Sequence, residues 1–192
     1  MSIAVAIKKD NDLVLATDSL VSFGSGQVPS ENYQTNKILT VGDAFIATTG
    51  WALYDNILID YISQQKSTPS LHDESAIFTF FLQLWKQLRK DYALVNEQCD
   101  DKLSPFADLD ASFLIVNPQG IFSVASNMNV IRFEQYYAIG SGSDYSLGAL
   151  YTLYKGKRSA QAIAKQAVAT AIALDTNCGG KINIHPIQPI TK

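Results

Sequence analysis

The order in which strand-like and helix-like segments follow one another constrains the fold of this chain more than any other feature. Short apolar runs with turn signals between them fill residues 1–50, and a second group of such runs lies in the middle of the chain. Each group is followed by two segments with apolar residues at helical spacing, and one more short run ends the chain. Such blocks, rather than strict alternation, predict mainly antiparallel sheets with helices outside them. We therefore expect an α+β fold, a four-layer α-β-β-α sandwich, with residues 1–192 as a single domain.

The strand-like runs are apolar or β-branched and are bounded by turn-forming residues. They are Ser2–Lys9, Leu13–Thr17, Lys37–Val41, Ala44–Thr49, Ala111–Val116, Ile121–Ala125, Val130–Ile139 and Lys181–Ile187. The first two are predicted to pair as a hairpin through a turn at Asp10–Asp12. Ser22–Asn32, rich in Gly, Ser, Pro and Asn, is predicted to be a surface loop, and Asp100–Asp110 an acidic linker.

Four segments are predicted to be helices: Trp51–Gln65, Glu74–Asn96, Ser143–Tyr154 and Ser159–Leu174, with Ser159 as an N-cap. The apolar residues at helical spacing are Trp51, Tyr54, Leu58, Ile59 and Ile62 in the first, and Ile77, Phe80, Phe81, Leu84, Trp85, Leu88 and Tyr92 in the second. We interpret the aromatic side chains as core. The second helix carries little charge, so we also expect it to supply surface for subunit contacts.

Composition excludes several classes of function. The 15 basic and 18 acidic residues give a net charge of −3 and no basic stripe, so we expect no nucleic-acid partner. No apolar run is long enough for a signal sequence or a membrane span, so we expect a cytoplasmic protein without a membrane partner. Cys99 and Cys178 lie far apart, match no metal-ligand spacing and fit a reducing compartment.

Two familiar kinds of catalytic site lack the residues they need. A Ser-His-Asp triad requires a histidine, and the chain has only His72, in a polar segment between two predicted helices, and His185, just before a proline. Two histidines with two cysteines also make no metal site. The Gly-rich segment that starts at Gly140 opens a predicted helix, but it is neither a P-loop nor a dinucleotide fingerprint, so no cofactor is expected.

A scattered set of polar residues remains, each of which also has an ordinary structural explanation. The set consists of Ser2, Asp18, Lys37, Ser141 and Asp175. Taken singly, Ser2 is an ordinary second residue and Asp18 a turn residue at a strand end. Lys37 is a solvated side chain, Ser141 a helix cap and Asp175 a residue at a helix end.

The start of the chain resembles proteasome β-subunits and the related bacterial peptidase encoded at heat-shock locus V. In members of this family the nucleophile is the first residue and is followed by a strand of the type x-I-x-V-x-x-K-x. A turn and a second apolar strand come next, and an aspartate follows that strand. Here Ser2-Ile-Ala-Val-Ala-Ile-Lys-Lys leads to Leu13-Val-Leu-Ala-Thr-Asp18. Counting back from Asp18 without gaps places Ser2 where the family has its N-terminal threonine.

Four later segments, in the correct order, extend the resemblance over essentially the whole chain. Thr35-Asn-Lys37-Ile-Leu is similar to the segment with the active-site lysine, and Ala47-Thr-Thr-Gly50 to the one that forms the oxyanion hole. Ile139-Gly-Ser141-Gly places Ser141 on the active-site serine. Asp175-Thr-Asn-Cys178-Gly-Gly is similar to the Asp-x-x-Ser-Gly-Gly motif, with Asp175 on its aspartate and Cys178 in place of its serine.

The resemblance implies an N-terminal-nucleophile hydrolase that cleaves peptide bonds once Met1 is removed. The α-amine of the new first residue, with a pKa of about 7.7–8.0, can then accept the hydroxyl proton, and a nearby lysine cation favours the neutral amine. The implied catalytic residues are Ser2, Asp18, Lys37, Ser141 and Asp175, with a backbone N–H of Gly50 or Thr48 for the oxyanion and Cys178 in support. No metal or cofactor is implied.

The family also implies partners. We expect a closed homo-oligomeric ring, a hexamer or heptamer that stacks with a second ring, fed with protein substrate by a separate ATP-dependent unfoldase. Two alternatives stay open. In the first, a retained Met1 blocks the amine of Ser2, and the chain is a non-catalytic ring-forming protein of the same fold. In the second, it is an amidase that acts on a small molecule.

Overall fold

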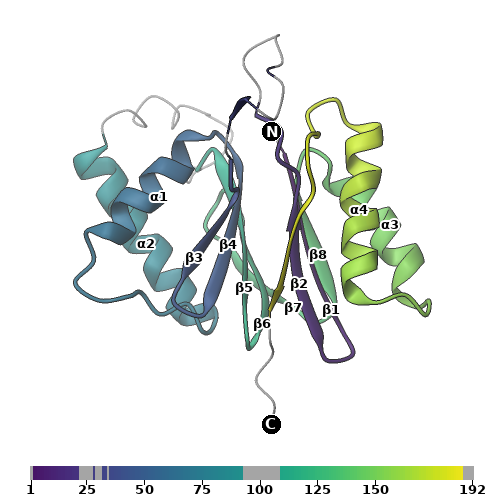
Figure 1. Ribbon diagram of the computed structural model, residues 1–192. Coiled ribbons are helices and arrows are strands. Elements are labelled where there is room, and N and C mark those ends of the chain that lie inside the picture. The colour runs from purple at the N-terminus through teal and green to yellow at the C-terminus, as the bar shows by residue number, and fades with distance from the viewer. Residues whose placement is uncertain (1, 22–27, 29–31, 34, 93–108, 188–192) are drawn as a thin grey trace.

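The computed structural model describes residues 2–21, 28, 32–33, 35–92 and 109–187. Figure 1 shows two sheets stacked face to face, with a pair of helices on the outer side of each. The predicted α+β four-layer sandwich is therefore confirmed. Met1, most of the predicted loop at Ser22–Asn32 and most of the predicted linker at Asp100–Asp110 lie outside the described residues.

The first sheet has four strands in the order β8-β1-β2-β9, and all its neighbours are antiparallel. These strands are β1 (Ile3–Lys9), β2 (Asp12–Thr17), β8 (Tyr136–Gly140) and β9 (Asn183–Ile187). The predicted hairpin is present, since Lys9 pairs with Asp12 and Ala4 with Thr17. The start of β1 and the end of β2 therefore lie side by side.

The second sheet has five antiparallel strands in sequence order, β3-β4-β5-β6-β7. They are β3 (Ile38–Val41), β4 (Ala44–Gly50), β5 (Ala111–Asn117), β6 (Gly120–Val124) and β7 (Val130–Phe133). The strand β4 ends at Gly50, where φ is +118° and an added Cβ would lie 2.4 Å from the Asp110 carbonyl oxygen. Only glycine fits this backbone without strain.

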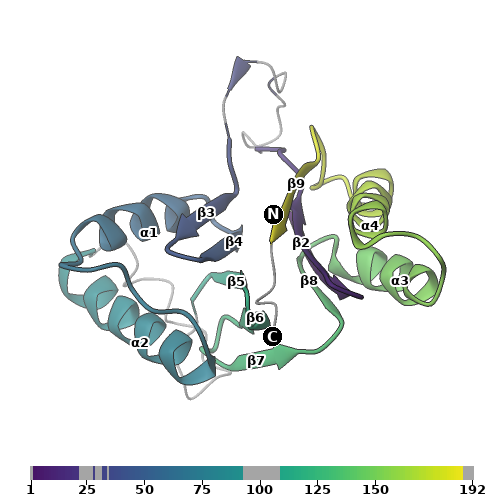
Figure 2. The same cartoon turned by 60° about the horizontal axis from the view of Figure 1, so that its bottom comes forward.

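Helices α1 (Leu53–Ser63) and α2 (Glu74–Asp91) cover the five-stranded sheet, and α3 (Ser143–Tyr154) and α4 (Ala160–Leu174) cover the four-stranded one (Figure 2). Three apolar clusters fill the spaces between the four layers, one under each helical pair and one between the sheets. As predicted, Ser159 caps α4 by accepting a hydrogen bond from the Ala162 N–H.

The run Val130–Ile139, which we predicted as one strand, is two strands in different sheets. It breaks after Phe133, so that β7 ends the five-stranded sheet and β8 begins the four-stranded one. The Lys8 N–H donates to the Gln135 carbonyl across this break, at 2.6 Å. A period-two pattern marks which side chains share a face but does not say which sheet a residue joins, so the sequence alone missed the crossing.

The two helices over the five-stranded sheet differ from the prediction in detail. Trp51 precedes α1 instead of lying on its buried face, because its N–H donates to the Asp110 carbonyl and prolongs the pairing of β4 with β5. Its side chain is 57% exposed, and Ile59 is 54% exposed on the outer side of α1. Most of the predicted apolar face of α2 is buried in the core. Phe78, which was not part of that predicted face, is exposed.

Candidate active site

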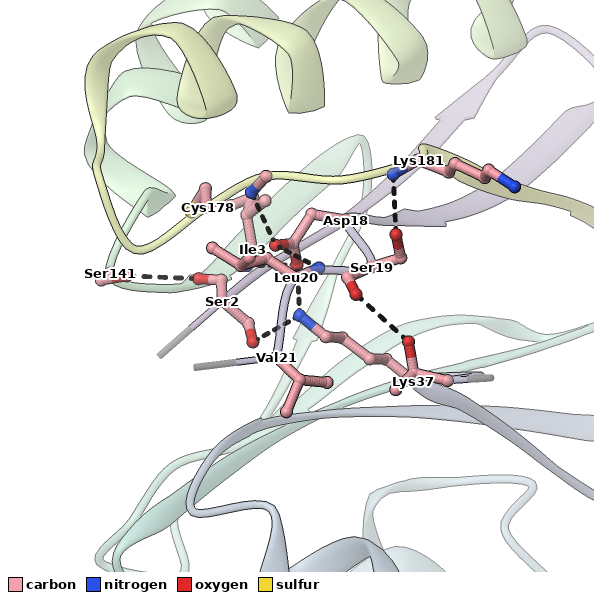
Figure 3. Close-up of polar contacts among 12 residues, drawn as sticks. Ser2, Ile3, Asp18, Ser19, Leu20, Val21, Lys37, Ser141, Cys178 and Lys181 are labelled. Atoms are coloured by element: carbon pink, nitrogen blue, oxygen red, sulfur yellow. Dashed lines mark hydrogen bonds and ion pairs between the residues drawn. The ribbon is translucent and has the colours of Figure 1, made fainter. Parts of the chain in front are cut away.

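The strand ends that carry the predicted site residues meet at one end of the sandwich. In the first sheet the start of β1 lies beside the ends of β2 and β8. The second sheet contributes the start of β3 and the end of β4, which are paired with each other. Residues that are far apart in sequence, such as Ser2, Asp18, Lys37 and Ser141, are thereby brought together (Figure 3).

Asp18 follows β2 directly, and its carboxylate is completely buried. One oxygen, Oδ1, accepts hydrogen bonds from the Ile3 N–H at 3.2 Å and from Lys37 Nζ at 2.7 Å. The other, Oδ2, accepts from the Gly179 N–H at 3.0 Å and from the Leu20 N–H at 3.4 Å. A buried carboxylate needs such donors to offset its lost hydration, and these four fix its orientation.

Lys37 lies just before β3 and joins Asp18 to the first described residue. Its Nζ is 2.8 Å from Ser2 Oγ as well as 2.7 Å from Asp18 Oδ1. The side chains of Lys37 and Asp18 are 9% and 0% exposed, and Ser2 is 7% exposed. A buried lysine this close to a hydroxyl stabilises negative charge that develops on its oxygen.

The β8–α3 turn packs against the backbone of Ser2. Ser141 Oγ donates to the Ser2 carbonyl oxygen at 3.5 Å. A Cβ on Gly140, where φ is +105°, would lie 2.1 Å from the same oxygen. The hydroxyl of Ser2 therefore points to Lys37, whereas its backbone faces Ser141.

Asp175 and Cys178 form the outer part of the site, at the end of α4. Cys178 Sγ donates to Asp175 Oδ2 at 3.3 Å, and Asn177 donates to Asp175 Oδ1 from its backbone N–H at 2.9 Å. Burial alone would raise the pKa of Asp175, but hydrogen bonds from Ser141, Asn177 and Cys178 outweigh it and hold the pKa below its ordinary value. Burial raises the pKa of the Cys178 thiol to about 12, and the adjacent Asp175 carboxylate adds to that rise.

The segment predicted to form the oxyanion hole brings in a residue that the sequence reasoning missed. Thr48 and Gly50 both lie in β4, and the Thr48 hydroxyl hydrogen-bonds to the carboxylate of Asp55 in the first turn of α1. Burial raises the pKa of Asp55, while the Thr48 hydrogen bond and the charge of Lys37 lower it. An acidic residue in a first helical turn is common for helix stability alone, so its place in the sequence gave no functional signal.

The two histidines lie away from these residues. His72 contacts Ser70 Oγ through Nδ1 at 2.6 Å and Asp73 Oδ2 through Nε2 at 3.0 Å in the α1–α2 connection, and His185 lies in β9 beside the Phe45 ring. Within the described residues, no group of His, Cys, Asp or Glu side chains is arranged to hold a metal ion. None of the described helices is both long enough and apolar enough to cross a membrane.

Comparison with known proteins gives relatives over nearly the full length of the chain, although no protein-family model matches it. Among curated proteins, the ATP-dependent protease subunit HslV of Roseobacter denitrificans is 23% identical over 187 residues, which cover 96% of this chain and 92% of that protein. The structure of eukaryotic HslV from Trypanosoma brucei has a TM-score of 0.69 at 20% identity, covering 97% of this chain and 99% of that one. At that identity the likeness shows the fold alone.

Two structures of Thiobacillus denitrificans BPH are more similar. The one in complex with epoxomicin has a TM-score of 0.88 at 30% identity and covers 97% of this chain and 98% of that chain. The other has a TM-score of 0.87 at 31% identity and covers 97% of each chain. With this identity over nearly the full length, and with the fold shared with HslV, the chain belongs to the HslV-like family of proteasome β-subunits, which are peptidases of the N-terminal-nucleophile hydrolase superfamily.

Proposed function

We propose that this chain hydrolyses peptide bonds with Ser2 as its N-terminal nucleophile once Met1 has been removed. The observation that carries the proposal is the position of Lys37 Nζ, 2.8 Å from Ser2 Oγ and 2.7 Å from Asp18 Oδ1, in a buried site at the start of β1. This geometry meets the need of a hydroxyl nucleophile for activation by an adjacent group.

The α-amine of Ser2 acts as the general base in this mechanism. It takes the proton of the Ser2 hydroxyl while Oγ attacks the carbonyl carbon of the substrate. Lys37 favours the neutral, proton-accepting amine and stabilises the charge on Oγ, and Asp18 holds Lys37 in place. The backbone N–H of Gly50 or Thr48 stabilises the oxyanion. The amine then passes its proton to the departing nitrogen, and water hydrolyses the ester on Ser2.

Ser141, Asp175 and Cys178 act as positioning residues for the amine. The Ser141 hydroxyl is within hydrogen-bond reach of two acceptors, the Ser2 carbonyl oxygen and the Asp175 carboxylate, and can donate its one proton to either. Cys178 donates to the same carboxylate, where the family motif has a serine. Since a thiol is a weaker donor than a hydroxyl, the carboxylate depends more on its other partners.

The comparisons support a role in protein degradation and in an assembly. The curated relative is named as a subunit of an ATP-dependent protease. We therefore propose a cytoplasmic homo-oligomeric ring, a hexamer or heptamer stacked with a second ring, that receives protein substrate from a separate ATP-dependent unfoldase. Because the related BPH has been solved with epoxomicin, we also expect this chain to bind that compound.

The test combines intact-mass spectrometry with peptide cleavage. Protein from the native host should lack Met1 and cleave fluorogenic peptides. Its molar mass by light scattering should be that of a ring. Ser2→Ala and Lys37→Met, made in protein that still loses Met1, should each abolish cleavage, while Lys165→Met on the exposed side of α4 should not. Full cleavage by processed Lys37→Met would refute the mechanism. Absence of cleavage by processed parental protein would instead favour the non-catalytic ring.

A further inference from the structure

A cavity of about 310 Å³ is lined by Gly140 and Ser141, the two residues that pack against the backbone of Ser2. The end of β4, the start of β5 and the β8–α3 turn form its walls, including Thr49, Ser112 and Ser141. Its volume is at the lower end of the range for sites that bind small ligands, and its lining offers several hydroxyls. The mechanism above uses two residues of this lining, Gly50 and Ser141, but assigns no part of the substrate to the cavity.

The geometry of Ser2 decides which part of a substrate would enter the cavity. The Ser2 hydroxyl points to Lys37, while its carbonyl oxygen meets Ser141 at 3.5 Å and the backbone of Gly140 packs closely against it. The α-amine belongs to the backbone of Ser2, so the departing nitrogen that collects its proton has to approach from the backbone side. Gly140 and Ser141, which pack against this backbone, also line the cavity.

Asp110 gives the cavity its charge. Among the described residues that line the cavity it is the charged one, and its side chain is exposed. Two hydrogen bonds hold the backbone of Asp110. Its N–H donates to the Tyr54 hydroxyl at 3.3 Å, and its carbonyl accepts from the Trp51 N–H at 3.3 Å. These two bonds hold the backbone that carries the carboxylate, and a carboxylate attracts a basic side chain and repels an acidic one.

We propose that this cavity binds the first residue after the scissile bond and that Asp110 selects a basic side chain there. The inference rests on the proposed function, since it needs an acyl group on Ser2 and a departing amine. It adds a binding site for the leaving segment of the substrate and a residue that determines specificity.

Acyl transfer to added amines tests this selection directly. Processed, assembled protein is given a peptide ester that acylates Ser2, together with argininamide, leucinamide or glutamic acid amide at equal concentration and low salt. The amine nitrogen attacks the acyl carbon, the new C–N bond replaces the ester bond to Ser2 Oγ, and the amine proton passes through the α-amine to Oγ. Mass spectrometry then gives the ratio of captured to hydrolysed product for each amine.

We expect argininamide to be captured about two- to fivefold better than leucinamide, the size of effect that an exposed charge pair gives, and glutamic acid amide to be captured least. Asp110→Asn should bring the ratio of argininamide to leucinamide close to one. Asp144→Asn, the same change in the first turn of α3 and outside the cavity lining, should keep the parental ratio.

Equal capture of the three amines by the parental protein, or a ratio that Asp110→Asn leaves unaltered, would overturn the inference and leave the proposed function standing. A protein on which no acyl group forms at Ser2 would overturn the proposed function and this inference with it. The mass of the acylated protein separates these results.

Discussion

Replacing Lys37 with methionine should destabilise the protein by about 3 kcal/mol, although the two side chains have similar volumes. Breaking a buried ion pair by removing one partner costs about 3–5 kcal/mol, because the other charge stays buried without compensation. Lys37 and Asp18 form such a pair, with 9% and 0% of their side chains exposed and 2.7 Å between Nζ and Oδ1. We expect the lower end of this range because Asp18 keeps three backbone N–H donors, from Ile3, Leu20 and Gly179.

Urea denaturation at pH 7 and one fixed protomer concentration measures this loss, because assembly makes stability depend on concentration. In thermal unfolding the same loss should lower the melting temperature by about 6–12 °C for a domain of this size. Lys165→Met, on the exposed side of α4, is the matched control and should change the free energy of unfolding by less than about 0.5 kcal/mol. A loss below about 1 kcal/mol for Lys37→Met, the value typical of a surface pair, would refute the buried ion pair.

Two further predictions concern the backbone of the site and its thiol. Gly140→Ala should lower the free energy of unfolding by about 2–3 kcal/mol, because its Cβ would lie 2.1 Å from the Ser2 carbonyl oxygen. Gly148→Ala, whose Cβ would have no atom within 4 Å, should instead stabilise α3 by about 0.5–1 kcal/mol. Equal effects of the two substitutions in urea denaturation would contradict this prediction. Burial raises the pKa of the Cys178 thiol to about 12, and an unfolded thiol ionises near pH 8.5, so the unfolded protein binds fewer protons above about pH 9. The free energy of unfolding should therefore fall as pH rises from about 9 toward 12, and Cys178→Ser should lack this contribution; denaturation curves at pH 8, 9 and 10 that change in parallel for the two proteins would exclude it.

The parts of the fold that depend on local pattern could be predicted from the sequence. The hairpin of β1 and β2 follows from two apolar runs joined by a short turn, and its register brings the starts and ends of the two strands together. The proximity of Ser2 and Asp18 is therefore a local consequence of the hairpin. The position of Lys37 is not, because β3 belongs to the other sheet and only the resemblance to the family pointed to it.

The features that sequence reasoning missed depend on contacts between distant segments. The exposure of Trp51 follows from a backbone hydrogen bond to Asp110, which lies about sixty residues further along the chain. That same bond fixes Asp110 beside the site, in a stretch whose composition indicated only an acidic linker. Asp55 was hidden for a different reason, since an acid in a first helical turn already has a structural explanation.

The contacts of Asp18 predict that stability and the proposed catalysis are coupled in this site. Its two oxygens accept from three backbone N–H groups as well as from Lys37, so one carboxylate joins β1, the segment after β2 and the segment after α4. An asparagine at this position would turn an NH₂ group toward backbone donors whichever way it faced, and loss of activity would then report on the fold as well as on the chemistry. Ser2→Ala removes one hydroxyl and leaves those bonds in place. Loss of activity in that variant, with unchanged unfolding, would therefore report on the proposed nucleophile alone.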